Sequence, residues 1–155
     1  MMPTKLDDVD VTVLKTLQEE GRVTNADLAR RVGLSPPSML QRVRKLEESG
    51  LIKGYKAILD AEQLGYPLTV IAMVSLSLHQ DSAIEQFRMA IQDIPEVIES
   101  LHVSGEYDFL LRIVARNMHD YERIVTEHLS KVKAVGRINS SFVLAQNKQS
   151  APIPL

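Results

Sequence analysis

Residues 34–52 have the sequence LSPPSMLQRVRKLEESGLI, which predicts a helix with a marked start and a marked end. Ser35 is a good N-cap, because its hydroxyl can accept a hydrogen bond from a free backbone N–H of the first turn. Pro36 follows at a position where the helix needs no N–H. Gly50 is the residue type that most readily adopts the left-handed conformation that ends helices. The stretch therefore predicts a helix of about four turns.

This helix combines an apolar stripe with a polar, basic face. Leu40, Val43 and Leu46 recur at three-residue spacing and predict the stripe. From residue 30 to residue 56, seven lysines and arginines accompany two glutamates, although the whole chain has a net charge of −2. Arginine and glutamine on such a helix can bond to base edges in the major groove, while nearby cations neutralise phosphates. An ordinary solvated helix face has the same composition, so both interpretations stay open at this point.

Two shorter helices are predicted before this one. Residues 6–21 predict a first helix, capped by Asp7 or Asp8. Thr24 opens a second helix, and Asp27 three residues later gives a weaker form of the capping box. Gly33 then separates this second helix from Ser35 by a turn that is too short for anything except a tight helical corner. Helix, glycine-containing turn, helix is typical of the helix-turn-helix motif, although the same shape also occurs in proteins that do not bind DNA.

Composition excludes several kinds of protein. The chain has 155 residues, of which 45% are apolar, enough for one domain or two small ones. The absence of cysteine excludes disulfides, thiolate metal sites and a cysteine nucleophile. The N-terminus lacks the apolar core of a signal peptide, and the longest apolar run is too short to span a bilayer. Neither the histidine spacing nor any motif suggests a metal, a cofactor or catalysis, so we expect a cytoplasmic protein that is not an enzyme and has no membrane association.

The pattern changes after residue 60. Residues 51–59 predict a short strand or wing, with Lys53 and Lys56 able to meet the DNA backbone. Residues 60–67 contain Gly65 and Pro67, which break the pattern. We therefore predict a winged helix-turn-helix DNA-binding domain at 1–60, a hinge at 61–67 and a second domain at 68–155.

The second domain is predicted to be a ferredoxin-like βαββαβ domain, which makes the fold class α+β. The expected strands are 68–78, 97–104, 107–115 and 135–144, and the expected helices are 82–94 and one beginning at Asn117 or Asp120. Gly105 and Glu106 are predicted to form a two-residue hairpin connection. Both helices would cover one face of the sheet, so the other face requires a cover, and a second copy of the chain is the obvious candidate.

Four stretches, in this order and spacing, resemble the Lrp/AsnC or feast/famine family of transcriptional regulators of bacteria and archaea. They are LDDVDVTVLKTLQEEGR from residue 6, NADLARRVGLSPPSMLQRVRKLEESGLIKGYKAILD from residue 25, SGEYDFLL from residue 104 and SSFVLAQNKQSAPIPL from residue 140. The resemblance implies that the N-terminal domain binds double-stranded DNA. It implies a C-terminal domain that dimerises through its sheets, and homodimers that often assemble into tetramers or octamers. It also implies a small effector, usually an amino acid, bound where neighbouring dimers meet.

The resemblance assigns a DNA-binding surface to the predicted recognition helix. Its members are Ser35, Pro37, Ser38, Gln41, Arg42 and Lys45. We expect the three near the front of the helix, Ser38, Gln41 and Arg42, to reach bases, and Lys45 to reach a phosphate. We add Arg44 and Lys53 for their charge, although Arg44 could equally pair with a glutamate.

The resemblance also places an effector pocket around the loop between the second and third strands. The loop residues are Ser104, Gly105, Glu106, Tyr107 and Asp108. Asp108 could accept the ammonium of an amino acid, and exposed N–H groups near Gly105 could bind its carboxylate. From the residues alone, Gly105 and Asp108 could equally serve only the turn. His102 is a plausible extra wall of the pocket, and Met118, Ser140 and Ser141 are carried over by position.

Two other functions compete with a DNA-binding regulator. Some haem-pathway decarboxylases resemble the same two-domain family, which gives an enzyme as one alternative. The excess of lysine and arginine at residues 30–56 and the lack of a histidine cluster argue against an enzyme. A small-molecule sensing module that acts through protein partners is the other alternative.

Overall fold

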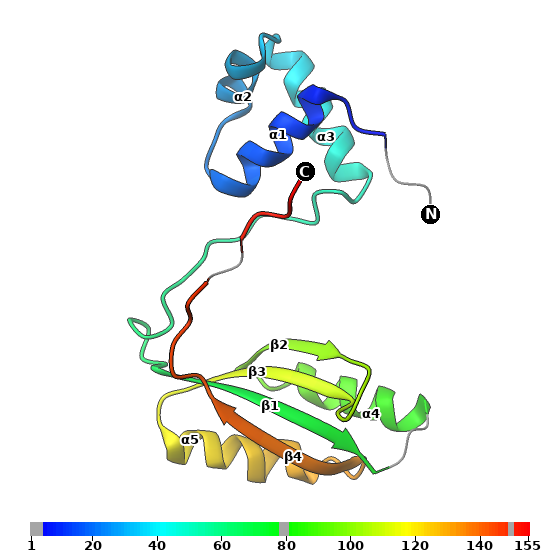
Figure 1. The fold of residues 1–155 in the computed structure, drawn as a ribbon, viewed down its shortest axis with the longest axis vertical. Coiled ribbons are helices and arrows are strands. Elements are labelled where there is room, and N and C mark those ends of the chain that lie inside the picture. Colours follow the sequence, from blue (N-terminus) through cyan, green and yellow to red (C-terminus); the bar gives the residue numbers. More distant parts are fainter. Residues whose placement is uncertain (1–4, 78–80, 149–150) are drawn as a thin grey trace. The chain divides into compact units, whose positions relative to one another are not determined.

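The computed structural model describes residues 5–77, 81–148 and 151–155, in two compact units (Figure 1). The first unit holds the residues up to 58 together with 148–155, and the second holds residues 59–147. The division differs from the expected boundaries at the end of the chain, because the last residues group with the first unit. There the Gln18 side chain accepts a hydrogen bond from the Ile153 N–H (2.6 Å) and donates one to the Ile153 carbonyl (3.1 Å).

The first unit contains the three predicted helices. They are α1 (Asp8–Glu19), α2 (Asn25–Val32) and α3 (Pro36–Glu48). Asp7 caps α1, Thr24 caps α2 and Ser35 caps α3, each by accepting a backbone hydrogen bond from the helix start. Gly33 has a φ of 71° in the turn between α2 and α3, a conformation that glycine adopts without strain. The helix-turn-helix prediction is confirmed.

The core of the first unit corrects the predicted stripe of α3. Its fully or nearly buried residues are Val13, Leu14, Leu28, Ala29, Met39, Val43 and Leu46. Met39 is fully buried, whereas Leu40 is 37% exposed. The reason is the helical period of about 3.6 residues, which keeps positions i, i+4 and i+7 on one side, while a strict three-residue spacing drifts around the helix.

The segment after α3 does not form the expected strand. Within the described chain, residues 53–60 are extended and exposed, with no partner strand. The Tyr55 hydroxyl donates a hydrogen bond to Glu47 of α3 (3.0 Å), and burial together with this carboxylate raises the pKa of Tyr55. The expected hinge residues form a helical turn in which the Asp60 carboxylate accepts hydrogen bonds from Gln63.

The second unit confirms the ferredoxin-like prediction. Its elements are β1 (Leu68–Leu76), α4 (Asp81–Gln92), β2 (Val97–His102), β3 (Phe109–Ala115), α5 (Met118–Arg123) and β4 (Val135–Phe142). The sheet has the order β2-β3-β1-β4, and every neighbouring pair is antiparallel. The helix begun by α5 continues as a π-helical turn (Ile124–His128) and a 3-10 turn (Leu129–Lys131). Leu78, the last residue of the expected first strand, lies outside the described residues.

The sheet has one covered face and one open face. Figure 1 shows α4 and α5 on the same side of the sheet. Alternate residues of β1, including Val70 and Val74, are buried against these helices with Phe87 and Phe109. The residues between them, Ile71 and Met73, point to the other side and are only partly buried. In this single chain the second face is therefore open among the described residues.

The connection between β2 and β3 is longer than predicted. β2 ends at His102 and β3 begins at Phe109, so residues 103–108 form the loop and the two-residue prediction is wrong. The Val103 N–H donates to the Asp108 carbonyl (2.9 Å), and Gly105 has a φ of 124° within the loop. Contacts from Asp108 to β1 hold this longer loop, and the local sequence contains no sign of them.

Candidate DNA-binding surface and effector region

The start of α3 is fixed by contacts within its own first turn. The Ser35 hydroxyl accepts a hydrogen bond from the Ser38 N–H (3.3 Å) and lies 2.8 Å from the Ser38 hydroxyl. Pro36 begins the helix, and Pro37 beside it is exposed. Ser35 and Ser38, two of the residues predicted to contact DNA, are therefore already hydrogen-bonded to each other at the start of the helix.

The outward face of α3 carries Gln41, Arg44 and Lys45, all of which are exposed. With about 3.6 residues per turn, Gln41 lies nearly opposite the buried Val43, and Arg44 lies about 100° from Val43 on the exposed flank. In the part of the chain that the structure describes, neither Arg44 nor Lys45 forms an ion pair. Lys53, on the following segment, is exposed as well. These side chains can meet DNA without first breaking an internal contact.

Two other cations of residues 30–56 already form ion pairs. Arg31 forms a bidentate pair with Glu20 at 2.6 and 2.7 Å, and Arg30 lies 3.1 Å from Asp27. The Arg31 guanidinium lowers the pKa of the Glu20 carboxyl. This stretch is thus less positive toward a ligand than its sequence suggests.

Arg42 lies differently from its neighbours on α3. Its Nη1 atom is 2.7 Å from Asp7 Oδ2 and 2.6 Å from Asp10 Oδ1, and the side chain is 28% exposed. The pKa of Arg42 is raised, first by the hydrogen bond with Asp10 and then by that with Asp7. The structure therefore directs this guanidinium to α1, away from the outward face on which it was expected beside Gln41. No sequence spacing signals this contact, because Asp7 and Arg42 are 35 residues apart.

In the second unit, the loop 103–108 is tied to β1 by Asp108. The Asp108 carboxylate accepts a hydrogen bond from the Leu76 N–H (2.7 Å), and the Asp108 N–H donates to the Val74 carbonyl (2.9 Å). The Ser75 hydroxyl donates to the Glu106 carbonyl (3.2 Å). Asp108 thus holds the loop in place, which is the structural role that the sequence alone also allowed.

The same loop is tied to β4 by its two outer side chains. Glu106 pairs with Arg137 at 2.7 Å, and this bond is the first cause of the raised pKa of Arg137. The Arg137 guanidinium lies 5.4 Å from the centre of the Tyr107 ring, a cation–π distance. Asn139 donates to the Tyr107 hydroxyl (3.1 Å). Ser104 and Gly105 are exposed at the tip.

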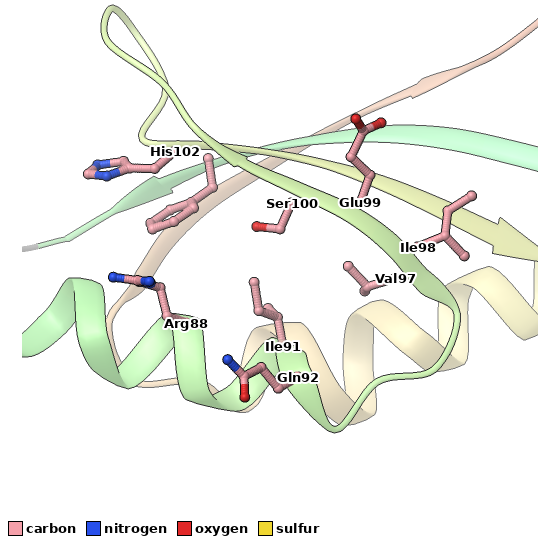
Figure 2. A pocket seen from close by; sticks show the side chains of 9 residues that line it. Arg88, Ile91, Gln92, Val97, Ile98, Glu99, Ser100 and His102 are labelled. Atoms are coloured by element: carbon pink, nitrogen blue, oxygen red, sulfur yellow. The ribbon is translucent and has the colours of Figure 1, made fainter. Parts of the chain in front are cut away.

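His102 lies at the base of the loop and borders a hollow between β2 and α4. Its ring stacks on Phe109, with centroids 4.8 Å apart. The hollow has a volume of about 520 Å³ and is lined by Arg88, Ile91, Gln92, Val97, Ile98, Glu99, Ser100, His102 and Phe109. Figure 2 shows His102 and Arg88 near one end of it, with Ile91 and Val97 along its floor. Arg88 lies 3.6 Å from Glu85, and Glu99 also lines the hollow, so its lining carries side chains of both charges.

Within one chain, the other expected effector residues lie away from the loop. Ser140 and Ser141 pair with Ala72 and Ile71 in the middle of β1. Ser140 Oγ lies 2.5 Å from the Tyr121 hydroxyl, and burial raises the pKa of that phenol. Met118 begins α5, which follows the opposite end of β3 from the loop. One chain brings His102 and the loop residues together, but not these three.

The described residues contain no group of three or more His, Asp or Glu side chains that could hold a metal ion. None of their helices is long and apolar enough to cross a membrane.

Sequence comparison assigns the two units. Residues 6–53 match the model of a winged helix-turn-helix DNA-binding domain, and residues 69–153 match the Lrp/AsnC ligand binding domain. The chain belongs to the Lrp/AsnC family of transcriptional regulators. A leucine-responsive regulatory protein of Rhizobium meliloti is 40% identical to this Lrp/AsnC regulator over 97% of each chain. The transcriptional regulator AzlB of Bacillus subtilis is 32% identical over 99% of this chain and 98% of its own.

Solved structures of Lrp/AsnC regulators share the fold. A transcriptional regulator of Neisseria meningitidis in complex with L-Met superposes with a TM-score of 0.90, at 34% identity, over 97% of both chains. An AsnC family regulator of Agrobacterium tumefaciens gives a TM-score of 0.87 at 30% identity, over 96% of this chain and 97% of its own. The relatives and matched domains are those of regulators, so the present Lrp/AsnC protein is not an enzyme, and the decarboxylase alternative is excluded.

Proposed function

We propose that this Lrp/AsnC regulator acts in the cytoplasm as a homodimer, or as a tetramer or octamer assembled from such dimers, on a roughly palindromic operator. An amino acid is proposed to change its assembly or its affinity for DNA. The observation that carries the proposal is the exposed, partly unpaired face of α3 in a unit separate from the matched ligand-binding domain. In a chain with two such units, a ligand can change DNA binding only if it binds one arrangement of the protein more tightly than another.

We assign base contacts on α3 to Gln41 and Arg44, and a phosphate contact to Lys45. Glutamine bonds bidentately to adenine and arginine to guanine, and both residues lie on the outward face. Ser35, Pro37 and Ser38 are placed against the DNA backbone at the start of the helix, and Lys53 against a phosphate. A dimer would present two such helices about one DNA turn, roughly 34 Å, or a multiple of it, apart.

The open face of the sheet is proposed as the dimer interface. Its centre is apolar, with Ile71, Met73 and Leu110 partly buried in one chain. Two ion pairs lie around this centre: Arg137 pairs with Glu106, and Arg112 Nε is 3.2 Å from Glu99 although it makes no hydrogen bond. A second copy would remove the apolar centre from water without burying an unpaired charge.

The loop 103–108 and His102 are proposed to bind the effector. The Neisseria relative was solved with L-Met, which supports an amino acid as the ligand class. Asp108 would receive the ammonium group, and the exposed backbone at Ser104 and Gly105 would receive the carboxylate. Met118, Ser140 and Ser141 lie elsewhere in the same chain, so in this proposal they would come from a neighbouring protomer.

Sedimentation tests the whole proposal. The purified protein is mixed with a fragment carrying its own upstream region, at fixed salt, with and without a panel of amino acids. We expect a sequence-specific complex whose mass or affinity shifts with at least one amino acid. Salt-sensitive binding without sequence preference, and with no response to the panel, would contradict it and favour a sensing module that acts through protein partners.

A further inference from the structure

Arg42 joins the predicted recognition helix to the start of α1. Its Nη1 atom contacts three carboxylate oxygens, at 2.9 and 2.7 Å from the two oxygens of Asp7 and at 2.6 Å from Asp10 Oδ1. The Asp10 side chain is only 15% exposed at this point. The contact with Asp10 is therefore partly shielded from solvent, whereas the contacts with Asp7 are exposed.

The two acids are also the capping box of α1. Asp7 Oδ1 accepts a hydrogen bond from the Asp10 N–H (2.7 Å), and Asp10 Oδ2 accepts one from the Asp7 N–H (3.2 Å). The usual capping box pairs a neutral serine or threonine with an acid or amide. Here both members carry a carboxylate, and like charges at such a distance oppose each other. A guanidinium between them removes that conflict.

We propose that Arg42 is a positioning residue of the DNA-binding unit: it anchors α3 to the α1 capping box and sets the direction of Gln41 and Arg44, and it does not itself read a base. This rests on α3 being the recognition helix. Arg42 immediately follows Gln41 and precedes the buried Val43, so a shift at Arg42 rotates the outward face.

The pKa values agree with a charge-assisted anchor. The pKa of Asp7 is lowered, first by the backbone hydrogen bond from Asp10 and next by the hydrogen bond from Arg42. Both bonds favour the ionised carboxylate, so at neutral pH the anchor consists of a cation and anions in direct contact.

Replacement of Asp10 tests the proposal, because an effect of charge alone and loss of the anchor would change DNA affinity in opposite directions. An aspartate beside a DNA-binding helix repels phosphates, so Asp10→Asn should tighten DNA binding if charge alone matters. If Asp10 holds Arg42 and thereby α3, the same change should weaken binding. The direction of the change decides between them.

The experiment uses the full chain and a duplex selected with the wild-type protein from a random library. Dissociation constants are measured over a series of salt concentrations for Asp10→Asn, Arg42→Gln, the double variant and Arg44→Gln. We expect the two single anchor variants to weaken binding by about five- to tenfold. The double variant should lose no more than Arg42→Gln alone, because Arg42→Gln already removes the contact with Asp10. The salt dependence should be unchanged in Arg42→Gln. Arg44→Gln should instead relax the preference for one base, because Arg44 is assigned to a base contact.

Arg42→Lys keeps the proposal testable if Arg42→Gln unfolds. Lysine retains the charge but presents a single ammonium on a flexible stem, so it holds the two acids less rigidly. We expect a folded protein with weakened binding and an unchanged salt slope. Asp10→Asn binding as tightly as wild type, or Arg42→Gln losing salt dependence as a phosphate contact would, overturns the proposal. If the wild-type protein selects no preferred duplex, the function proposed above fails instead.

Discussion

Asp7 has more partners than an exposed helix cap usually needs. It accepts hydrogen bonds from Asp10 and from Arg42, and these lower the pKa of its carboxyl below the ordinary 3.8. A carboxyl with a lowered pKa stabilises the folded state above its unfolded-state pKa, and this contribution disappears as the pH falls through the folded-state pKa. The pair with Arg42 thus stabilises the first unit at neutral pH.

The first prediction concerns Asp7→Asn. At pH 7 the variant should unfold at a lower urea concentration than the wild type, because asparagine keeps the cap but loses the charge. The difference should begin to shrink as the pH falls below about 4, the unfolded-state pKa of aspartate, and should disappear as the pH falls through the lower folded-state pKa. Urea unfolding monitored by circular dichroism at several pH values measures both. A difference that is independent of pH would mean that the charge does not contribute.

The second prediction separates two roles of Asp108. Asparagine at this position can still accept the Leu76 N–H but cannot neutralise an ammonium group. Asp108→Asn should therefore keep the loop and weaken binding of the responsive amino acid by about 2 kcal/mol or more, measured by calorimetry. Asp108→Ala should lose both functions. Unchanged amino-acid affinity in Asp108→Asn would leave Asp108 with the structural role alone.

At the residue scale, local sequence predicted caps but not partners. Ser35 and Thr24 were placed correctly, because a cap bonds to its own helix within three residues. Arg42 was expected to face DNA, and its partner Asp7 lies 35 residues away. The helical period predicts which residues share a face of a helix. It does not predict their ion pairs, because these depend on how the helices pack.

At the element scale, β4 depends on a glycine. The pairing of β1 with β4 shifts register at Ser75 and Leu76, opposite Gly136. A Cβ added at Gly136 would lie 3.1 Å from the Ser77 nitrogen and 3.3 Å from the Ser75 carbonyl oxygen. Both are backbone atoms, so they cannot move aside as a flexible side chain can.

The third prediction is that Gly136→Ala destabilises the second unit by about 1–3 kcal/mol. Gly21→Ala is the matched control, since no atom lies within 4 Å of the added Cβ and its φ is not in the left-handed region. Thermal unfolding of both variants measures the difference. Equal melting temperatures would show that the bulge adjusts without cost.

The order of elements was predictable because hydrophobic period distinguishes helices from strands along most of the chain. Residues 51–59 were predicted to form a short strand or wing, and only the strand alternative is wrong: no neighbouring strand pairs with them in the described single chain. The loop 103–108 was predicted too short, since contacts with β1 and β4 decide its length. Both errors concern elements that tertiary neighbours define.

At the scale of the whole molecule, the open sheet face would link assembly to DNA binding if it is the dimer interface, as proposed above. A single recognition helix contacts a half-site, whereas a dimer engages two half-sites at once and gains from the effective concentration of the second. Operator affinity should therefore fall when the sheet faces separate, even though α3 is unaltered.

The fourth prediction tests that link with Met73→Glu. Met73 lies on the open face of β1, and a carboxylate there would be buried without a partner in a dimer. We expect a monomer by sedimentation, with operator affinity reduced by about a hundredfold or more and half-site affinity unchanged. Met89→Glu is the control, because Met89 is 60% exposed on α4, outside the sheet face. Urea unfolding checks that Met73→Glu remains folded. A folded variant that sediments as the wild type does would place the dimer interface elsewhere. A monomer with full operator affinity would show that the two helices bind independently.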